Sequence, residues 1–208
     1  MSDPPEKTVA TGYDAIVARY LDWSGRVVDP TRDRMFDELL QMLPAGARVL
    51  DIGCGAGVPW TQRLSARFDV VGVDISDAQV ALARENVPSA GFIVGDVSAL
   101  SLPAGSFDAA IAFYSISHIP RERHPDLLRR IGAWLKPGGL LLATMGASDI
   151  PAWTGEWLGV PMFFSAHDAD ANRAAVREAG LDLMADEVVT VDEPEGNVTF
   201  LWVLARKK

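Results

Sequence analysis

Cysteine is almost absent from this chain of 208 residues, which contains only Cys54. A single thiol can form neither an internal disulfide bond nor a cysteine-based zinc site. We therefore expect a protein without disulfide bonds and without a bound metal. A location in the reducing cytoplasm is consistent with this cysteine content.

Long apolar runs are missing as well. No stretch of about 18 consecutive apolar residues occurs, so no membrane-spanning helix and no membrane partner are predicted. The segment Met1–Ala10 is polar and lacks the apolar core of a secretory signal. We expect roughly residues 1–9 to form a mobile tail.

Positive charge is the third scarcity, because 19 Lys and Arg residues face 28 Asp and Glu residues and the formal net charge is −9. Nucleic-acid binding draws its affinity from clustered basic side chains, so we expect no nucleic-acid partner. Glu122 and Asp126 partly offset the one local basic group, which consists of Arg121, Arg123, Arg129 and Arg130. We interpret that group as the solvated face of a helix.

Apolar segments typical of strands alternate with helical segments through the middle of the chain. The strands are expected at residues 48–51, 68–74, 91–94, 107–113 and 140–145. Such nearly continuous apolar strands, separated by helices, indicate a mostly parallel sheet covered on both faces, a doubly wound α/β fold. Further helices are expected at 13–23, 32–43 and 168–179, an irregular aromatic segment at 146–165, and a terminal hairpin from strands 183–191 and 198–205.

A glycine-rich turn follows the first expected strand, in the segment Asp51–Gly57. Glycines are needed where the backbone turns tightly or lets a ligand approach closely, so a nucleotide-like ligand is plausible. Val58 stands where a dinucleotide-binding fingerprint would have its third glycine. No lysine lies between Ala47 and Val94, which excludes a P-loop.

Three carboxylates stand at the ends of successive strands: Asp51, Asp74 and Asp96. The carboxyl ends of parallel strands open onto one crevice, so these side chains are expected to surround one ligand. Three carboxylates repel a pyrophosphate and suit a ligand with hydroxyls, an amino group and a positive centre. Each aspartate alone is also explained as a turn or helix-start residue.

In this combination of motifs the sequence resembles the class I S-adenosylmethionine-dependent methyltransferases, over roughly Tyr13 to Met145. Asp51–Gly57 is similar to the glycine-rich first motif of that family, and Asp74 to its ribose-binding acid. The segment Gly95–Val97 is similar to the part that meets the adenine. The resemblance implies a Rossmann-like seven-stranded sheet with strand order 3-2-1-4-5-7-6, in which strand 7 is antiparallel.

The resemblance also implies the cofactor, S-adenosyl-L-methionine, with S-adenosyl-L-homocysteine as its product. Family members often have Met at position 79, where this chain has Gln79, and we expect Ile75 to supply the apolar contact instead. Cys54 is interpreted as a small side chain packed under the loop, since no nearby His or Lys would activate it. The implied cofactor-binding residues are Tyr13, Tyr20, Asp51, Gly53, Cys54, Gly55, Gly57, Asp74, Ile75, Gln79, Asp96, Val97, Phe113 and Tyr114.

On this basis residues 1–208 are expected to form one domain. Residues 10–45 would be a helical lid, 46–145 the cofactor-binding core, 146–166 a substrate-side insertion, and 167–208 the terminal helix and hairpin.

Methyl transfer from a sulfonium depends mainly on holding the reacting atoms in line. A general base is needed only for a protonated nucleophile, and His118, just after the fourth strand, is the candidate. A structural or substrate-orienting role for His118 is the alternative. Asp168, Asp170 and Asn172 could suggest a metal site, but their place at a helix start favours capping.

Substrate choice is expected to lie in the aromatic segments, which could roof a cavity for a small apolar or aromatic methyl acceptor. The alternative is that these rings pack the sheet edge or a dimer contact. The expected substrate-binding residues are Trp23, Ser117, Trp153, Trp157, Met162 and Phe163. The accepting atom, O, N or C, stays open.

Three other functions remain as alternatives. The chain could bind the cofactor without turnover, methylate a protein or RNA, or, less in keeping with its motifs, act as an NAD(P)-dependent oxidoreductase. We expect a monomer or a homodimer.

Overall fold

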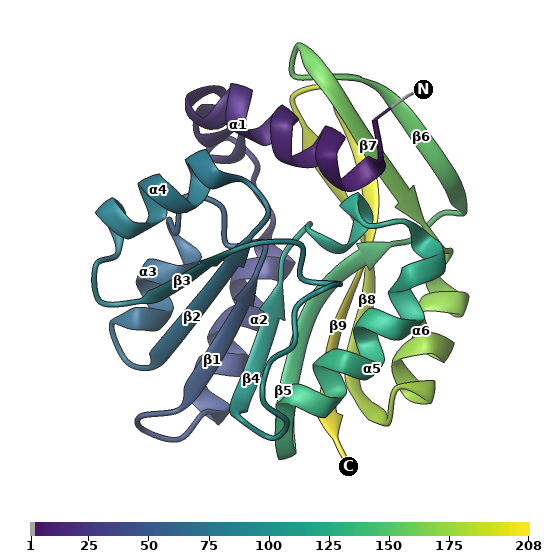
Figure 1. Cartoon of the computed structure of the whole chain (residues 1–208). Helices are drawn as coiled ribbons and strands as arrows, with labels where there is room; N and C mark the ends of the chain where they lie inside the picture. The colour runs from purple at the N-terminus through teal and green to yellow at the C-terminus, as the bar shows by residue number, and fades with distance from the viewer. Residues whose placement is uncertain (1–2) are drawn as a thin grey trace.

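The computed structural model describes residues 3–208, and its central feature is a seven-stranded sheet in the order β3-β2-β1-β4-β5-β9-β8 (Figure 1). Strands β1 to β5 are parallel, and β9 runs antiparallel to both of its neighbours. This confirms the predicted order, with β8 and β9 as the sixth and seventh strands. The strands are β1 (Arg48–Ile52), β2 (Asp69–Asp74), β3 (Gly91–Val94), β4 (Phe107–Ala112), β5 (Leu135–Gly146), β8 (Leu181–Glu193) and β9 (Gly196–Lys207).

Helices cover both faces of the sheet because neighbouring apolar residues on a strand point to opposite faces. Val49 belongs to the core with α2 (Pro30–Met42) and α3 (Trp60–Ser65). Leu50 belongs to the core with α5 (His124–Trp134) and α6 (Ala169–Glu178). Figure 1 shows α5 and α6 together on one side of the sheet. Both faces are buried, as the continuous apolar strands predict.

Helix starts follow the side-chain signals in the sequence. Ser76 caps α4 (Asp77–Asn86) by accepting a hydrogen bond from the Gln79 amide. Asp168 caps α6 by accepting from the Ala171 amide. The capping interpretation of Asp168 is therefore confirmed. No group of three or more potential metal ligands was found among residues 3–208.

The N-terminal helix α1 (Pro5–Ser24) corrects the expectation of a tail over residues 1–9, of which 1 and 2 lie outside the described residues. Pro4 and Pro5 occupy the N-cap and the first helical position, where a missing amide hydrogen carries no penalty. Val9 is buried, so this segment is packed rather than mobile.

Residues 146–165 were expected to be irregular, but they contain most of an antiparallel hairpin, β6 (Ile150–Trp157) and β7 (Val160–Ala166). Leu158 and Gly159 form its turn, and both have positive φ, 49° and 77°. Such a turn usually begins with Asn, Asp or Gly, so with Leu158 at this position the sequence does not indicate a turn. Most of β6 is exposed, so the strand lacks the alternation by which a strand is recognised.

Of the predicted lid, residues 10–45, α1 covers the carboxyl ends of the strands and packs beside β7 (Figure 1). The contact is close, because a Cβ on Gly12 would lie 2.9 Å from the Met162 side chain. Helix α2 instead packs on the face of the sheet. Neither α1 nor any other helix in residues 3–208 is long and apolar enough to cross a membrane.

Candidate active site

Two adjoining cavities lie under α1 at the carboxyl ends of the central strands. The smaller has a volume of about 90 Å³ and lies on the side of Asp74 and Asp96. The larger has a volume of about 1090 Å³ and extends from Asp51 towards β6 and the β8–β9 turn. The two cavities share the lining residues Tyr13, Tyr20, Gly53, Gly55, Phe113, Tyr114 and His118.

The glycine-rich turn forms the floor of both cavities. Gly53 has φ of +75°, and a Cβ there would lie 2.3 Å from Cβ of Ser115. Gly55 has φ of +53° and also lines both cavities, so its missing side chain leaves room for a ligand against the backbone. Gly57 lines neither cavity and packs against Val87, which makes it a turn residue.

Asp74 ends β2 at the wall of the smaller cavity. Its carboxylate accepts hydrogen bonds from the backbone amides of Gly55, at 2.8 Å, and Ser76, at 2.9 Å. Burial raises the pKa of Asp74 despite these bonds, and nearby Asp14 adds to the rise. The carboxylate is held in place and retains acceptor capacity towards the cavity.

Asp51 lies below the glycine-rich turn and is almost completely buried. It accepts a 2.6 Å hydrogen bond from Thr61, and burial raises its pKa to about 7. Within residues 3–208, neither Asp51 nor Asp74 has a Lys or Arg partner. A positively charged or hydroxyl-bearing ligand would compensate these carboxylates, whereas a pyrophosphate would be repelled.

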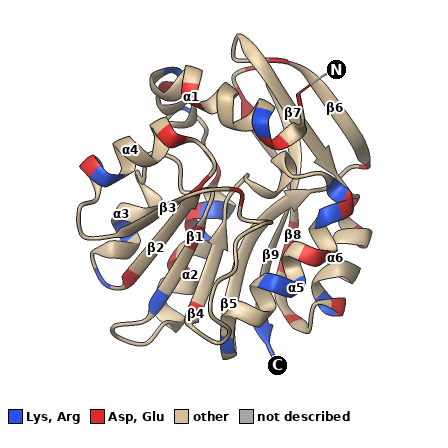
Figure 2. Cartoon of the chain, viewed as in Figure 1, with Lys and Arg blue, Asp and Glu red and all other residues tan. Residues whose placement is uncertain are grey.

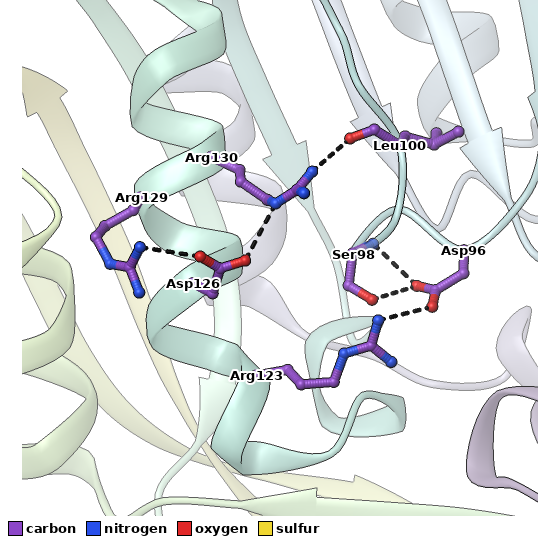
Figure 3. Close-up of polar contacts among 7 residues, drawn as sticks. All are labelled: Asp96, Ser98, Leu100, Arg123, Asp126, Arg129 and Arg130. Atoms are coloured by element: carbon purple, nitrogen blue, oxygen red, sulfur yellow. Dashed lines mark hydrogen bonds and ion pairs between the residues drawn. The ribbon is translucent and has the colours of Figure 1, made fainter.

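Asp96 follows β3, and its contacts are drawn in Figure 3. One carboxylate oxygen accepts from the amide and hydroxyl of Ser98, at 2.9 Å and 2.6 Å, and the other pairs with Arg123 at 3.1 Å. Asp96, Val97 and Arg123 all line the smaller cavity. Arg123 was not among the expected site residues, because its pairing with Asp96 joins the loop after β3 to the separate short helix η2 (Arg121–Arg123).

The remaining arginines of the basic group also have acidic partners. Arg129 and Arg130 both pair with Asp126 on α5 (Figure 3). Arg121 pairs with Asp149. Basic and acidic residues alternate over α5 and α6 in Figure 2, in agreement with a solvated helix face.

Gln79 is the most unusual polar residue of the site. It is 1% exposed, lines the smaller cavity beside Ile75, and neither its amide nitrogen nor its amide oxygen has a partner in residues 3–208. A buried amide without hydrogen bonds costs about 1–3 kcal/mol. This cost indicates that the amide is present for a ligand.

His118 lies on the short helix η1 (Ile116–His118), where both ring nitrogens have partners. Nδ1 is 3.0 Å from the carbonyl oxygen of Phe163, and Nε2 is 2.8 Å from the hydroxyl of Tyr13. Burial lowers the pKa of His118 to about 4 and raises that of Tyr13. The imidazole is therefore neutral, with its proton on Nδ1.

Aromatic residues line the larger cavity, including the predicted Trp23, Trp153 and Trp157, together with Ser117. Trp23 and Trp157 are in edge contact, with centroids 5.2 Å apart. Met162 and Phe163 were expected here but line neither cavity. Both are buried in the cluster that contains Val9 and Ile16 of α1. Phe164 lines the larger cavity, and alternation along β7 puts Phe163 on the opposite face of the strand.

Cys54 packs under the turn, as predicted, against β2. A Cβ on Gly72 would lie 2.8 Å from its sulfur. Burial raises the pKa of the Cys54 thiol, and the nearby Asp51 and Asp74 raise it further. The thiol is thus a poor nucleophile.

Tyr114 closes the site from the β4 side with a strained backbone, at φ of 56°. Its hydroxyl donates a 2.6 Å hydrogen bond to buried Asp29. Asp29 also accepts from Trp202 and caps α2 at the Arg32 amide. This network fixes the loop after β4 to α2 and β9, and no local sequence signal indicates it.

These features fit S-adenosylmethionine. The glycine turn leaves space at the backbone, Gln79 offers an unpartnered amide, and the buried carboxylates have no cation of their own. The residues expected to bind the cofactor line these two cavities, with the exception of Gly57.

Comparisons with known proteins agree with this chemistry. A family model described as a methyltransferase domain matches residues 49–139. The 27-O-demethylrifamycin SV methyltransferase of Amycolatopsis mediterranei is 32% identical over 95% of this chain and 74% of its own length. Two solved structures share the fold at 20% identity. A TehB-like SAM-dependent methyltransferase from Corynebacterium glutamicum has a TM-score of 0.70 over 95% of this chain and 99% of its own. The [4+2]-cyclase SpnF has a TM-score of 0.74 over 100% and 97%. The chain belongs to the class I S-adenosylmethionine-dependent methyltransferases.

Proposed function

We propose that this methyltransferase transfers a methyl group to a small, apolar or aromatic molecule bound in the larger cavity. The observation that carries the proposal is the continuity of the two cavities, which share seven lining residues including Tyr13 and His118. A volume of about 1090 Å³ is slightly above the usual range of about 300–1,000 Å³ for small-molecule sites, which leaves room for an acceptor beside the cofactor. The relative from Amycolatopsis mediterranei, whose name specifies a rifamycin, supports a small-molecule acceptor.

The nucleoside part of the cofactor would lie at the smaller cavity and extend past the shared lining residues into the larger one. Asp74 would accept hydrogen bonds from the ribose, Gln79 would use its unpartnered amide, and Asp96 and Val97 would lie at the adenine. Asp51 lies towards the larger cavity, where an amino group and a positive sulfur would be stabilised by its charge. The bound cofactor supplies an activated methyl group on sulfur.

The contribution of His118 is to orient the acceptor rather than to remove its proton. Its Nε2 accepts a hydrogen bond from the hydroxyl of Tyr13 at the junction of the cavities, and the oxygen of that hydroxyl keeps acceptor capacity for a donor group on the methyl acceptor. A general base must hold the transferred proton, and burial opposes this by lowering the pKa of His118 to about 4. Orientation alone accounts for a large part of catalysis in an in-line displacement.

The test is transfer of a labelled methyl group from S-adenosylmethionine to a panel of apolar hydroxyl and amine compounds, followed by His118→Ala and His118→Gln on the best acceptor. Gln accepts a hydrogen bond but takes up no proton near neutral pH. We expect His118→Ala to lower kcat at least tenfold and His118→Gln to restore most of it. Equal losses of about 10²-fold in both variants would instead identify a base.

This assay, together with measured binding of S-adenosylmethionine and of NAD(P)H, separates the alternative functions. Cofactor binding without labelling of any small molecule would favour a binding protein or an acceptor that is a protein or RNA. Binding of NAD(P)H in place of S-adenosylmethionine would favour an oxidoreductase. A monomer or homodimer in the cytoplasm, without a nucleic-acid partner, completes the proposal.

A further inference from the structure

The charged side chains that line the larger cavity differ in whether they have partners. Among the described residues these side chains are Arg32, Asp51, Glu193 and Glu195. Asp51 accepts from Thr61, and Glu195 accepts from the indole nitrogen of Trp23.

Arg32, the one cation among these four side chains, also has partners. Arg32 donates to the carbonyl oxygen of Val27, and its guanidinium lies 4.7 Å from the ring centre of Trp60. Within residues 3–208, only Glu193 of the four has no hydrogen-bond or ion-pair partner. Among the described residues, the acceptor side of the site therefore has one carboxylate without any polar partner, Glu193.

Glu193 ends β8 at the turn into β9, and its Cα pairs with Gly196. No side chain therefore faces it from the partner strand. Burial, together with the charge of Glu195, raises the pKa of Glu193 to about 7. A carboxylate in this position is stabilised by a cation delivered with a ligand.

The charge of Glu193 also reaches the centre of the site. Tyr13, Tyr20 and Tyr114 have pKa values raised chiefly by burial, in Tyr114 next by its hydrogen bond to Asp29, and in all three to a smaller extent by Glu193. Glu193 lines the larger cavity together with these three tyrosines.

The aromatic lining adds a second feature that suits a cation. Tyr20 and Trp23 are stacked with centroids 6.0 Å apart, and Trp157 contacts both rings. The faces of Trp and Tyr attract cations, and the attraction grows when water is excluded. An aromatic wall beside one unpaired carboxylate is suited to a protonated amine on an apolar body.

We propose that Glu193 binds a protonated amine of the methyl acceptor, so that the acceptors of this enzyme are apolar or aromatic amines. The inference rests on the proposed function, since it assumes that the acceptor occupies the larger cavity. The amine is a recognition group and need not be the methylated atom. An anionic acceptor is disfavoured, because Glu193, Glu195 and Asp51 outnumber Arg32.

The experiment compares 2-phenylethylamine with 2-phenylethanol, two probes of similar size of which only the first is a cation at pH 7.5. Their binding to the full chain is followed by protein NMR, with and without saturating S-adenosylmethionine. The variants are Glu193→Gln, which keeps the shape of the side chain and removes its charge, and Glu195→Gln as the matched control. Cofactor affinity of each protein is measured separately by calorimetry.

We expect the wild type to bind the amine about tenfold more tightly than the alcohol. Glu193→Gln should abolish this preference and leave alcohol binding unchanged, while Glu195→Gln should keep at least a third of the amine affinity. No amine preference in the wild type, or equal losses in the two variants, would overturn the assignment. If S-adenosylmethionine itself failed to bind the wild type, the proposed function would fail independently of Glu193.

Discussion

The hydroxyl of Tyr13 lies 2.8 Å from Nε2 of His118, which joins α1 to the loop after β4. The other ring nitrogen of His118 bonds to the Phe163 carbonyl, so β7 is joined at the same point. One imidazole thus holds the covering helix and the hairpin together at the boundary of the two cavities. In the function we propose, closure of the site and orientation of the acceptor depend on the same two side chains.

The buried imidazole predicts a pH dependence of stability. His118 has a pKa of about 4 in the folded chain and about 6.5 when unfolded, so the unfolded state binds more protons between these values. The stabilisation that results from this pKa difference is fully present above pH 6.5 and is lost as the pH falls towards 4. We expect the unfolding free energy of the wild type, minus that of His118→Gln, to fall over this window by up to about 1.4 kcal/mol per pH unit.

Denaturant titrations at a series of pH values measure this difference, and NMR of the imidazole protons reports the titration of His118 directly. Subtracting the variant matters because Asp51 and Glu193, with pKa values raised to about 7, contribute with the opposite sign. An imidazole that titrates near 6.5 would refute the neutral tautomer assigned to His118.

The unpartnered amide of Gln79 predicts opposite effects on stability and binding. Gln79→Leu removes a buried group without hydrogen bonds, so the ligand-free protein should gain about 1 kcal/mol in unfolding free energy. The same variant should bind S-adenosylmethionine about tenfold more weakly. Chemical denaturation and calorimetry measure the two effects, with the exposed Gln62→Leu on α3 as control. A loss of stability together with unchanged affinity would assign Gln79 to the core.

The network around Asp29 predicts a large structural effect. Asp29→Ala removes the cap of α2 and leaves the buried groups of Tyr114 and Trp202 without their acceptor. We expect a loss of about 3 kcal/mol or more in unfolding free energy, since a cap contributes about 1 kcal/mol and each orphaned donor costs a similar amount or more. Asp33→Ala, exposed in the first turn of α2, should change stability by less than about 0.5 kcal/mol. A loss of only about 1 kcal/mol in Asp29→Ala would show that the cap alone matters and that the bonds from Tyr114 and Trp202 do not.

The parts of the site that could be predicted are those encoded locally. Asp51 and Asp74 stand at the ends of apolar strands, so the rule that parallel strands share one ligand-binding edge was enough to bring them together. The same is true of Ser76 and Asp168, whose capping depends on residues three positions away.

The parts that could not be predicted depend on contacts between distant segments. Glu193 reaches the site only because β8 and β9 extend beyond the sheet towards α1, and nothing in its neighbourhood in the sequence indicates this. The exchange of Phe163 for Phe164 in the cavity lining has a similar origin. Because the β6–β7 hairpin was not predicted from the sequence, the pairing register of its strands could not be predicted either. A shift of one residue in that register moves every side chain to the opposite face of the strand.

Asp74 allows the most direct test of the central claim, that this site binds S-adenosylmethionine. The measurement is the calorimetric affinity of the wild type, Asp74→Ala and the exposed control Asp77→Ala for this cofactor, with NADH as a competing ligand. We predict that Asp74→Ala weakens binding by about 1–3 kcal/mol, that Asp77→Ala does not, and that NADH does not compete. Equal cofactor affinity in all three proteins, or displacement of the cofactor by NADH, would contradict the account.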